Sequence, residues 1–199
     1  MMFHKRSKIA FLLNPRCGST SLREYLDQFG FTYPLIRINE EPYFHWHPTY
    51  EECVATYPAL KQYQMYAIFR DPLDRFVSAL EFAFTIESLK LSRTKSYDQV
   101  IDKLFRWDPT RTLLGIPGEL FTPQVHWVLG DNVEVIPYNG FTERVREVVS
   151  VCGGLEKKIA KYNATSRKVL NAPSDAVRQF VSERFANDYV FGRGAGLLV

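Results

Sequence analysis

Short, unbroken apolar runs alternate along the chain with segments whose apolar residues recur at helical spacing. The apolar runs, around residues 8–14, 65–69 and 133–138, are typical of strands that are buried on both faces. The helical stripes are Leu22, Tyr25, Leu26 and Phe29; Leu73, Phe76, Val77, Leu80 and Phe84; Val145, Val148, Val149 and Cys152; and Val177, Phe180, Val181 and Phe185. Strands that alternate with helices predict an α/β fold with a central, mostly parallel sheet flanked by helices.

Capping residues mark the expected ends of several helices. Short polar side chains stand where helices are expected to begin, at Thr49, Asp71, Thr142 and Ser174. Pro72 follows Asp71 at the first helical position, where its missing N–H costs nothing. Gly30 and Gly153 close two of the helical stripes.

The middle of the chain, residues 85–123, departs from this alternation. It contains one helix-like piece near residues 97–107 and several proline and glycine residues. We expect an insertion over the C-terminal edge of the sheet, which is the edge at which α/β folds bind ligands. Because no linker divides the chain, residues 1–199 are expected to form a single domain.

Composition and charge narrow the class of protein. Of the 199 residues, 46% are hydrophobic and 24% are charged, as in ordinary soluble globular proteins. The net charge of +3 is too small to indicate a nucleic-acid partner. Three cysteines fit a reducing compartment better than a disulfide framework. The apolar run after Lys8 is too short for a signal peptide, and no stretch reaches the ~20 apolar residues of a membrane span, so we expect a soluble, cytoplasmic protein without a membrane partner.

Residues 15–21, Pro-Arg-Cys-Gly-Ser-Thr-Ser, lie between the first expected strand and the first expected helix. A helix N-terminus presents backbone N–H groups and the positive end of the helix dipole to an anion. Gly18 permits close approach of the backbone, three hydroxyls follow it, and Arg16 adds a permanent charge with forked donors. The loop therefore predicts a site for a tetrahedral oxyanion. The missing second glycine with Lys and Ser or Thr argues against a Walker A loop, while a plain helix cap stays an alternative.

A second anion site is expected near Arg70 and Ser78. Arg70 follows the strand at residues 65–69, on the sheet edge where the first loop also emerges. Ser78 lies about two helical turns into the next helix. Taken alone, the pair is also explained by a solvated arginine and a buried serine.

Together the two segments resemble the PAPS-dependent sulfotransferases, especially those that act on carbohydrates. PAPS is 3′-phosphoadenosine 5′-phosphosulfate. Residues 14–22 resemble the 5′-phosphosulfate loop of that family, and residues 69–80 resemble its 3′-phosphate motif, while weaker similarity lies at residues 163–167 and 187–192. The resemblance implies a P-loop-like sulfotransferase fold and PAPS as the cofactor, with no metal.

The resemblance also implies a role for each matching residue. The residues are Arg16, Cys17, Gly18, Ser19, Thr20 and Ser21 for the 5′ phosphate and sulfuryl group, Arg70 and Ser78 for the 3′ phosphate, and Ser166 and Arg167 for closure over the nucleotide. Many family members carry lysine where this chain has Arg16. Because arginine does not readily donate a proton, Arg16 is expected to stabilise charge rather than to act as a general acid.

His47 and His45, in that order, are the candidate catalytic bases. In an extended segment both side chains would point to the same face, and imidazole can remove a proton from a hydroxyl near neutral pH. Residues 44–47, Phe-His-Trp-His, resemble the Phe-His-Gly-His stretch of uronyl 2-O-sulfotransferases, where a histidine is the base. Two surface histidines, or half of a metal site with Cys53, stay open as alternatives, although no well-spaced fourth ligand accompanies them.

A different chemistry fits the same loop. Cys17 and Arg23 have the Cys-x5-Arg spacing of cysteine-dependent phosphatases, in which a thiolate attacks phosphorus and the arginine clamps the oxyanion. Glu24 stands where those enzymes carry serine or threonine. A nucleotide-binding module without catalysis is a third reading. Because of the resemblance, we expect a sulfotransferase that moves a sulfuryl group in line from PAPS to an acceptor hydroxyl. The resemblance of residues 44–47 favours a saccharide over a tyrosine side chain or a small metabolite as the acceptor.

Overall fold

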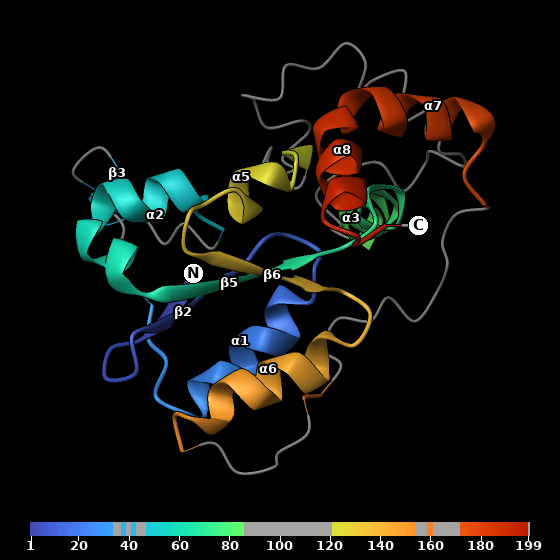
Figure 1. Ribbon diagram of the computed structural model, residues 1–199. Helices are drawn as coiled ribbons and strands as arrows, with labels where there is room; N and C mark the ends of the chain where they lie inside the picture. Colours follow the sequence, from blue (N-terminus) through green and yellow to red (C-terminus); the bar gives the residue numbers. More distant parts are fainter. Residues whose placement is uncertain are drawn as a thin grey trace. The chain divides into compact units, whose positions relative to one another are not determined.

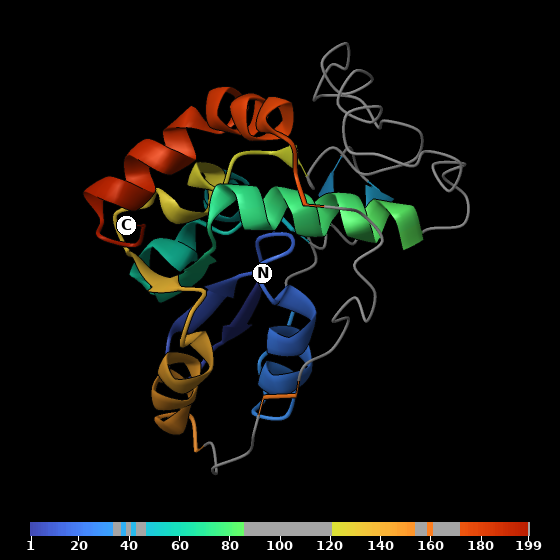
Figure 2. The ribbon, with the colours of Figure 1, turned by 90° about the vertical axis from the view of Figure 1, so that its right-hand side faces the viewer.

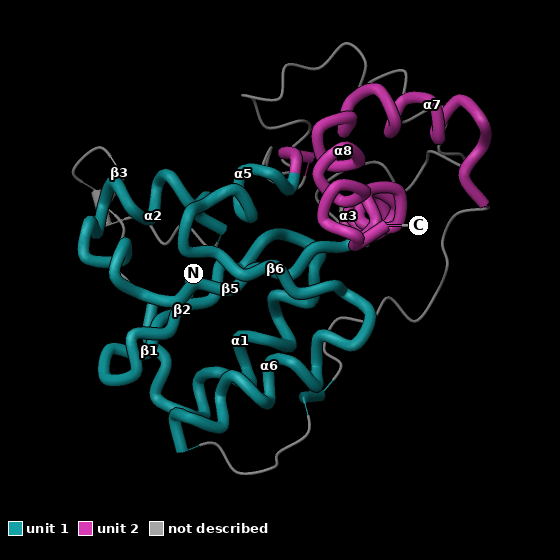
Figure 3. Tube along the Cα trace, viewed as in Figure 1, with its two compact units in different colours: residues 1–70, 124–163 teal, residues 71–123, 164–199 magenta. Residues whose placement is uncertain are grey.

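The computed structural model describes residues 1–33, 37–38, 41–42, 47–85, 121–153, 159–160 and 172–198. The chain forms two compact units, which Figure 3 colours separately. The first unit comprises residues 1–70 and 124–163, and the second comprises residues 71–123 and 164–199. The expected single domain stays a prediction. The expected insertion at residues 85–123 lies mostly outside the described residues, as do the predicted site residues His45, Ser166 and Arg167.

The first unit is built on a sheet whose described strands follow the order β1-β2-β5-β6 (Figure 1). These strands are β1 (Met2–His4), β2 (Ile9–Leu12), β5 (Gln64–Phe69) and β6 (Val133–Pro137). β1 is antiparallel to β2, whereas β2, β5 and β6 are parallel. The expected strands and the mostly parallel sheet are therefore confirmed. β1 is an additional edge strand, and β3 (Arg37–Ile38) and β4 (Glu41–Pro42) form a separate antiparallel pair.

Helices cover both faces of the four-stranded sheet. α1 (Ser19–Asp27) and α6 (Phe141–Ser150) lie side by side on one face, as Figures 1 and 2 show. α2 (Tyr50–Thr56) and α5 (Val125–Val128) lie on the other face (Figure 1). The 3-10 helix η1 (Pro58–Gln62) leads into β5. This cover on both sides explains why β2 and most of β5 are apolar along their length.

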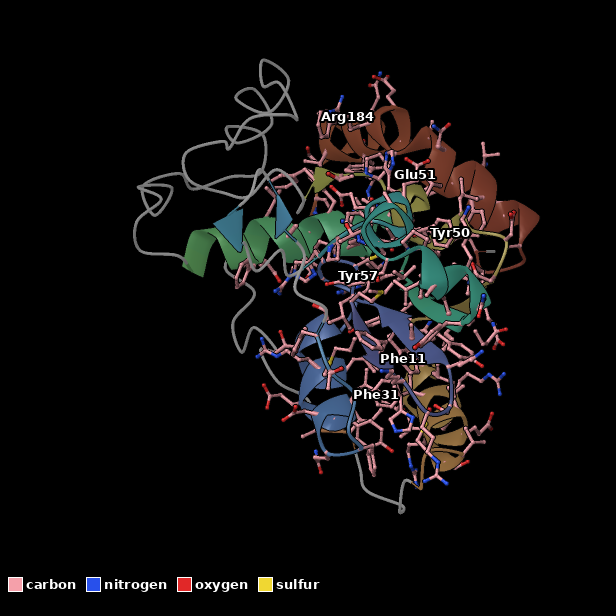
Figure 4. The ribbon with its side chains drawn as sticks, turned by 90° about the vertical axis from the view of Figure 1, so that its left-hand side faces the viewer. Phe11, Phe31, Tyr50, Glu51, Tyr57 and Arg184 are labelled. Carbon is pink, nitrogen blue, oxygen red and sulfur yellow. The ribbon has the colours of Figure 1, made fainter. Side chains whose placement is uncertain are left out.

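A large part of the core lies between the sheet and the pair of helices α1 and α6. Phe11 stacks on Tyr66 of the neighbouring strand, with ring centroids 5.2 Å apart, and lies 5.8 Å from Phe31 (Figure 4). Leu22 and Leu26 of α1 are buried in the same cluster. Burying a side chain of this size stabilises the fold by about 1.5–3 kcal/mol. Since α1 has only nine residues, this packing rather than intrinsic propensity holds it as a helix.

The expected N-cap at Asp71 and the expected helix starts near Thr49 and Ser174 are confirmed. At α2 the Thr49 side chain accepts from the backbone of Glu52, and the Glu52 carboxylate accepts from the backbone N–H of Thr49, which makes a capping box. At α3 (Pro72–Thr85) the N–H of Asp74 donates to the Asp71 carboxylate at 3.0 Å. At α7 (Asp175–Arg184) Ser174 is the cap.

The expected N-cap at Thr142 is wrong. α6 begins at Phe141, and its N-cap is Gly140 in the left-handed conformation, with φ of 82°. The Thr142 hydroxyl donates to the Glu143 carboxylate at 2.7 Å instead. The glycine ends the preceding turn two residues earlier than the side-chain pattern suggests, so a hydroxyl cap is not needed.

The second unit contains α3, α7 and α8 (Ala186–Gly194) in its described part. Phe76 of α3 packs against Phe180 of α7, with ring centroids 5.6 Å apart, and against Phe185, with ring centroids 5.9 Å apart. Arg75 is buried, and its Nη1 donates to the carbonyl of Thr122 at 2.9 Å. Among the described helices of the whole chain, none is long and apolar enough to cross a membrane.

Cys53 should make the stability of the protein sensitive to alkaline pH. Burial raises the pKa of its thiol from the ordinary value to about 12. Between the ordinary pKa and 12 the folded state binds more protons than the unfolded state, so the free energy of unfolding falls as the pH rises. The advantage of wild type over Cys53→Ala should therefore shrink by on the order of 1 kcal/mol per pH unit above pH ~8.5.

Urea unfolding at several pH values between 8 and 11 measures this difference. Cys152→Ala, at a partly exposed cysteine, is the matched control. A stability difference between wild type and Cys53→Ala that does not change with pH would contradict the prediction.

Candidate anion site at the end of the parallel strands

The loop that joins β2 to α1 has an unusual backbone. Arg16 has a φ of 61° and Gly18 a φ of 79°, so both adopt the left-handed conformation. For a residue with a side chain, such as Arg16, this conformation costs roughly 1–2 kcal/mol. Backbone strain of this kind persists only where the surroundings fix it, and it is concentrated at functional sites.

The N-terminus of α1 opens directly from this loop. Gly18 is the N-cap residue, no side chain caps the helix, and its first turn holds no acidic residue. Ser19 and Thr20 are half-buried, whereas Ser21 is buried at 7% exposure. The helix dipole and two partly exposed residues with hydroxyl groups therefore favour an anion here, whereas Ser21 lies in the interior.

Arg70 lies against the loop, at the end of the neighbouring strand β5. Its Nη1 donates to the carbonyl of Arg16 at 3.1 Å, and its guanidinium lies 4.6 Å from the centroid of the Tyr138 ring. Its Nε is buried and has no hydrogen-bond partner among the described residues. A buried charged donor without an acceptor costs free energy that a bound anion would recover.

Two buried amides tie the loop to β5. The Asn14 side chain donates to the carbonyl of Ile68 at 2.7 Å. The Oε1 of Gln124 accepts from the N–H of Arg70 at 3.0 Å and from the Cys17 thiol at 3.2 Å, and its Nε2 donates to the carbonyl of Arg70 at 2.8 Å. The sequence pattern misses Gln124, because its partners lie 54 and 107 residues away and no local motif marks it.

An aromatic pair supports the site from β6 and α6. Tyr138, under the Arg70 guanidinium, stacks on Phe141 with ring centroids 5.6 Å apart. Phe141 in turn lies so close to Gly18 that a Cβ there would sit 3.1 Å from its Cζ. Tyr138 follows the last residue of a parallel strand, and that position is the signal by which sequence reasoning could have found it.

His47 lies against Leu13, just before the loop at residues 15–21. Its Nδ1 donates a hydrogen bond to the carbonyl of Leu13, and its own carbonyl accepts from the indole N–H of Trp127 at 3.2 Å. A carbonyl only accepts, so Nδ1 carries the proton in this contact. In the neutral ring Nε2 then has the lone pair, which is the form that a general base requires.

The two residues of the phosphatase reading occupy different surroundings. The Cys17 side chain is 1% exposed, and its thiol donates to Gln124. Arg23 forms an ion pair of 2.9 Å with Glu24 on the exposed side of α1. A nucleophilic thiolate needs access and an electropositive setting, and burial of the Cys17 side chain provides no such access.

The predicted site residues fall into three groups, and one of these, His45, Ser166 and Arg167, lies outside the described residues. Within the first unit, Arg70 contacts the loop at Arg16, and His47 contacts Leu13, which lies shortly before that loop. Ser78 lies half-buried on α3 in the second unit, and its role stays a prediction. In the described part of the chain, no three His, Cys, Asp or Glu side chains are grouped as metal ligands.

Comparison of the chain with protein-family models, curated proteins and solved structures finds no match.

Gly18 should be less replaceable than another glycine of similar conformation. Gly18→Ala places a side chain at positive φ and pushes it into Phe141, whereas Gly30→Ala, at φ of 76°, meets nothing nearer than 3.9 Å. Both variants should lose about 1 kcal/mol from the conformation alone. Chemical denaturation should show a larger loss for Gly18→Ala than for Gly30→Ala, and equal losses would contradict the packing described here.

Proposed function

We propose that this chain is a sulfotransferase that binds PAPS and transfers its sulfuryl group to an acceptor hydroxyl. The observation that carries the proposal is the guanidinium of Arg70, which is held against the carbonyl of Arg16 while its buried Nε has no acceptor among the described residues. The loop before the α1 N-terminus and the Arg70 guanidinium therefore lie together at one edge of the sheet. A nucleotide with a 5′ phosphosulfate and a 3′ phosphate carries two anionic groups on one ribose.

The residues of the loop suit the 5′ phosphosulfate. The uncapped α1 N-terminus, the Ser19 and Thr20 hydroxyls and the charge of Arg16 would bind it, and Arg70 would bind the 3′ phosphate. PAPS, when bound, supplies a sulfuryl group whose transfer spreads negative charge over its oxygens. The fixed N–H groups of the loop and Arg16 would stabilise that charge without reorganisation.

The hydrogen bond at Nδ1 suits His47 to the role of base. Nε2 would accept the proton of the acceptor hydroxyl as its oxygen bonds to sulfur and the bond between sulfur and the 5′ phosphate breaks, releasing 3′-phosphoadenosine 5′-phosphate. The Leu13 carbonyl would stabilise the resulting imidazolium through Nδ1. The base acts on the acceptor and not on the nucleotide. Loss of His47 should therefore lower turnover and leave nucleotide affinity unchanged.

The surroundings of Cys17 support sulfuryl transfer over the phosphatase reading. A buried thiol that donates to Gln124 and an Arg23 paired with Glu24 are both placed for structure rather than for attack on phosphorus. We also propose a cytoplasmic location, which rests on the low and odd number of cysteines in the sequence. We further propose the P-loop-like sulfotransferase fold and a saccharide acceptor, which rest on the resemblance of residues 14–22, 69–80 and 44–47.

Arg70→Ala should weaken binding of 3′-phosphoadenosine 5′-phosphate, the nucleotide product, by at least about tenfold, because a charge-assisted hydrogen bond is worth about 1.5–3 kcal/mol. Isothermal titration calorimetry measures this affinity. Arg23→Ala is the matched control, since it removes an arginine that pairs with Glu24 outside the proposed site. The phosphatase reading predicts the reverse order of effects, so a larger loss with Arg23→Ala would contradict the proposal.

His47→Asn should lower turnover by roughly 10²–10⁴-fold while nucleotide affinity stays unchanged. The asparagine amide retains a donor near the position of Nδ1 and removes Nε2, so the contact with Leu13 is preserved while the base is lost. Transfer of radiolabelled sulfate from PAPS to a panel of saccharides, tyrosine peptides and small alcohols measures the turnover. Equal losses in turnover and nucleotide affinity would argue against the role of base, and binding of the nucleotide without transfer to any acceptor would favour a binding module.

A further inference from the structure

Gln124 stands where the chain returns to the first unit. The chain leaves that unit after Arg70 and re-enters it at Gln124. These two residues bind each other through a pair of hydrogen bonds, from the Arg70 N–H to Oε1 at 3.0 Å and from Nε2 to the Arg70 carbonyl at 2.8 Å. Gln124 is completely buried. The Gln124 side chain therefore links the two positions at which residues 71–123 connect to the first unit.

The orientation of the Gln124 amide is determined by its partners. The backbone N–H of Arg70 can only donate and its carbonyl can only accept, so Oε1 and Nε2 cannot be exchanged without loss of both bonds. The same Oε1 also accepts from the thiol of Cys17, at 3.2 Å. One side chain thus joins the backbone of Arg70 to the loop residue that follows Arg16.

Arg70 is consequently held from two sides. Gln124 fixes its backbone, and the Arg16 carbonyl fixes its Nη1 at 3.1 Å. The buried Nε lies between these two attachments along the residue. A guanidinium recognises an oxyanion through the fixed geometry of its donors, so its affinity depends on how closely its position is defined.

We propose that Gln124 is a positioning residue that aims Arg70 at the second anion of the ligand and couples that subsite to the loop. The inference rests on the proposed function, in which that anion is the 3′ phosphate of the nucleotide. Gln124 itself does not touch the ligand. Its removal should therefore reduce discrimination for the 3′ phosphate, and leave binding through the 5′ phosphate largely intact.

The experiment compares the affinities of 3′-phosphoadenosine 5′-phosphate and adenosine 5′-phosphate by calorimetry on the full chain. Gln124→Met nearly keeps the side-chain volume and removes the hydrogen bonds to Arg70 and Cys17, and it should lower the preference for the 3′-phosphorylated nucleotide by about tenfold. Gln28→Met, at an exposed glutamine that donates to the Glu24 carbonyl, is the matched control and should leave the preference unchanged. A general loss of stability would weaken the binding of both nucleotides alike and leave the ratio of their affinities unchanged.

A double substitution tests whether Gln124 acts through Arg70. In the Arg70→Ala background, Gln124→Met should cause no further loss of affinity for 3′-phosphoadenosine 5′-phosphate, since residues that act as one unit are not additive. Should Gln124→Met fail to fold, Gln124→Asn provides a second variant, because its shorter amide cannot span both backbone groups of Arg70.

The possible outcomes separate the two proposals. Equal affinity of wild type for the two nucleotides would overturn the proposed function and this inference with it. A wild-type preference that survives in the folded Gln124 variant, or an additive loss in the double variant, would overturn the role of Gln124 and leave the proposed function standing.

Discussion

The parallel pairing of β2 with β5 is the constraint on which the candidate site depends. Its register sets Leu12 opposite Ala67, so the loop after β2 and the arginine after β5 emerge side by side. The Asn14 side chain extends this pairing beyond the strands by its bond to the Ile68 carbonyl. A shift of the register would separate Arg70 from the loop, and the buried apolar faces of both strands oppose such a shift.

Among the described residues, the buried side-chain amides at this edge are hydrogen-bonded, whereas the Nε of Arg70 is not. Asn14 and Gln124 are buried and hydrogen-bonded, as buried amides in folded proteins generally are. The Nε of Arg70 departs from this pattern among the described residues. This Nε and the left-handed backbone at Arg16 both lower the stability of the fold at this site, and a bound anion would offset this cost.

The fold was predictable where local pattern and burial agree. The apolar runs of β2, β5 and β6 and the buried stripe of α7 reflect burial directly, so sequence alone locates them. β1 escapes prediction because a three-residue edge strand gives no periodic signal. The N-cap of α6 was misassigned because Gly140, not the hydroxyl of Thr142, sets where that helix begins.

The candidate site was predictable only in part. The loop at residues 15–21 and Arg70 carry recognisable chemistry at strand ends, and the parallel sheet brings them together. Gln124 and the contact between His47 and Leu13 depend on packing between segments distant in the sequence, which no local pattern encodes. The sequence therefore identifies the groups that would meet the ligand better than the groups that hold them in place.

Hydrogen–deuterium exchange with and without 3′-phosphoadenosine 5′-phosphate tests the central claim most directly, because it locates the bound nucleotide on the chain. The account predicts slower exchange in peptides that cover residues 14–22 and in those that cover residues 68–72, with both protected together. Absence of protection at the loop, or protection confined to other segments, would contradict the assignment of this sheet edge as the nucleotide site.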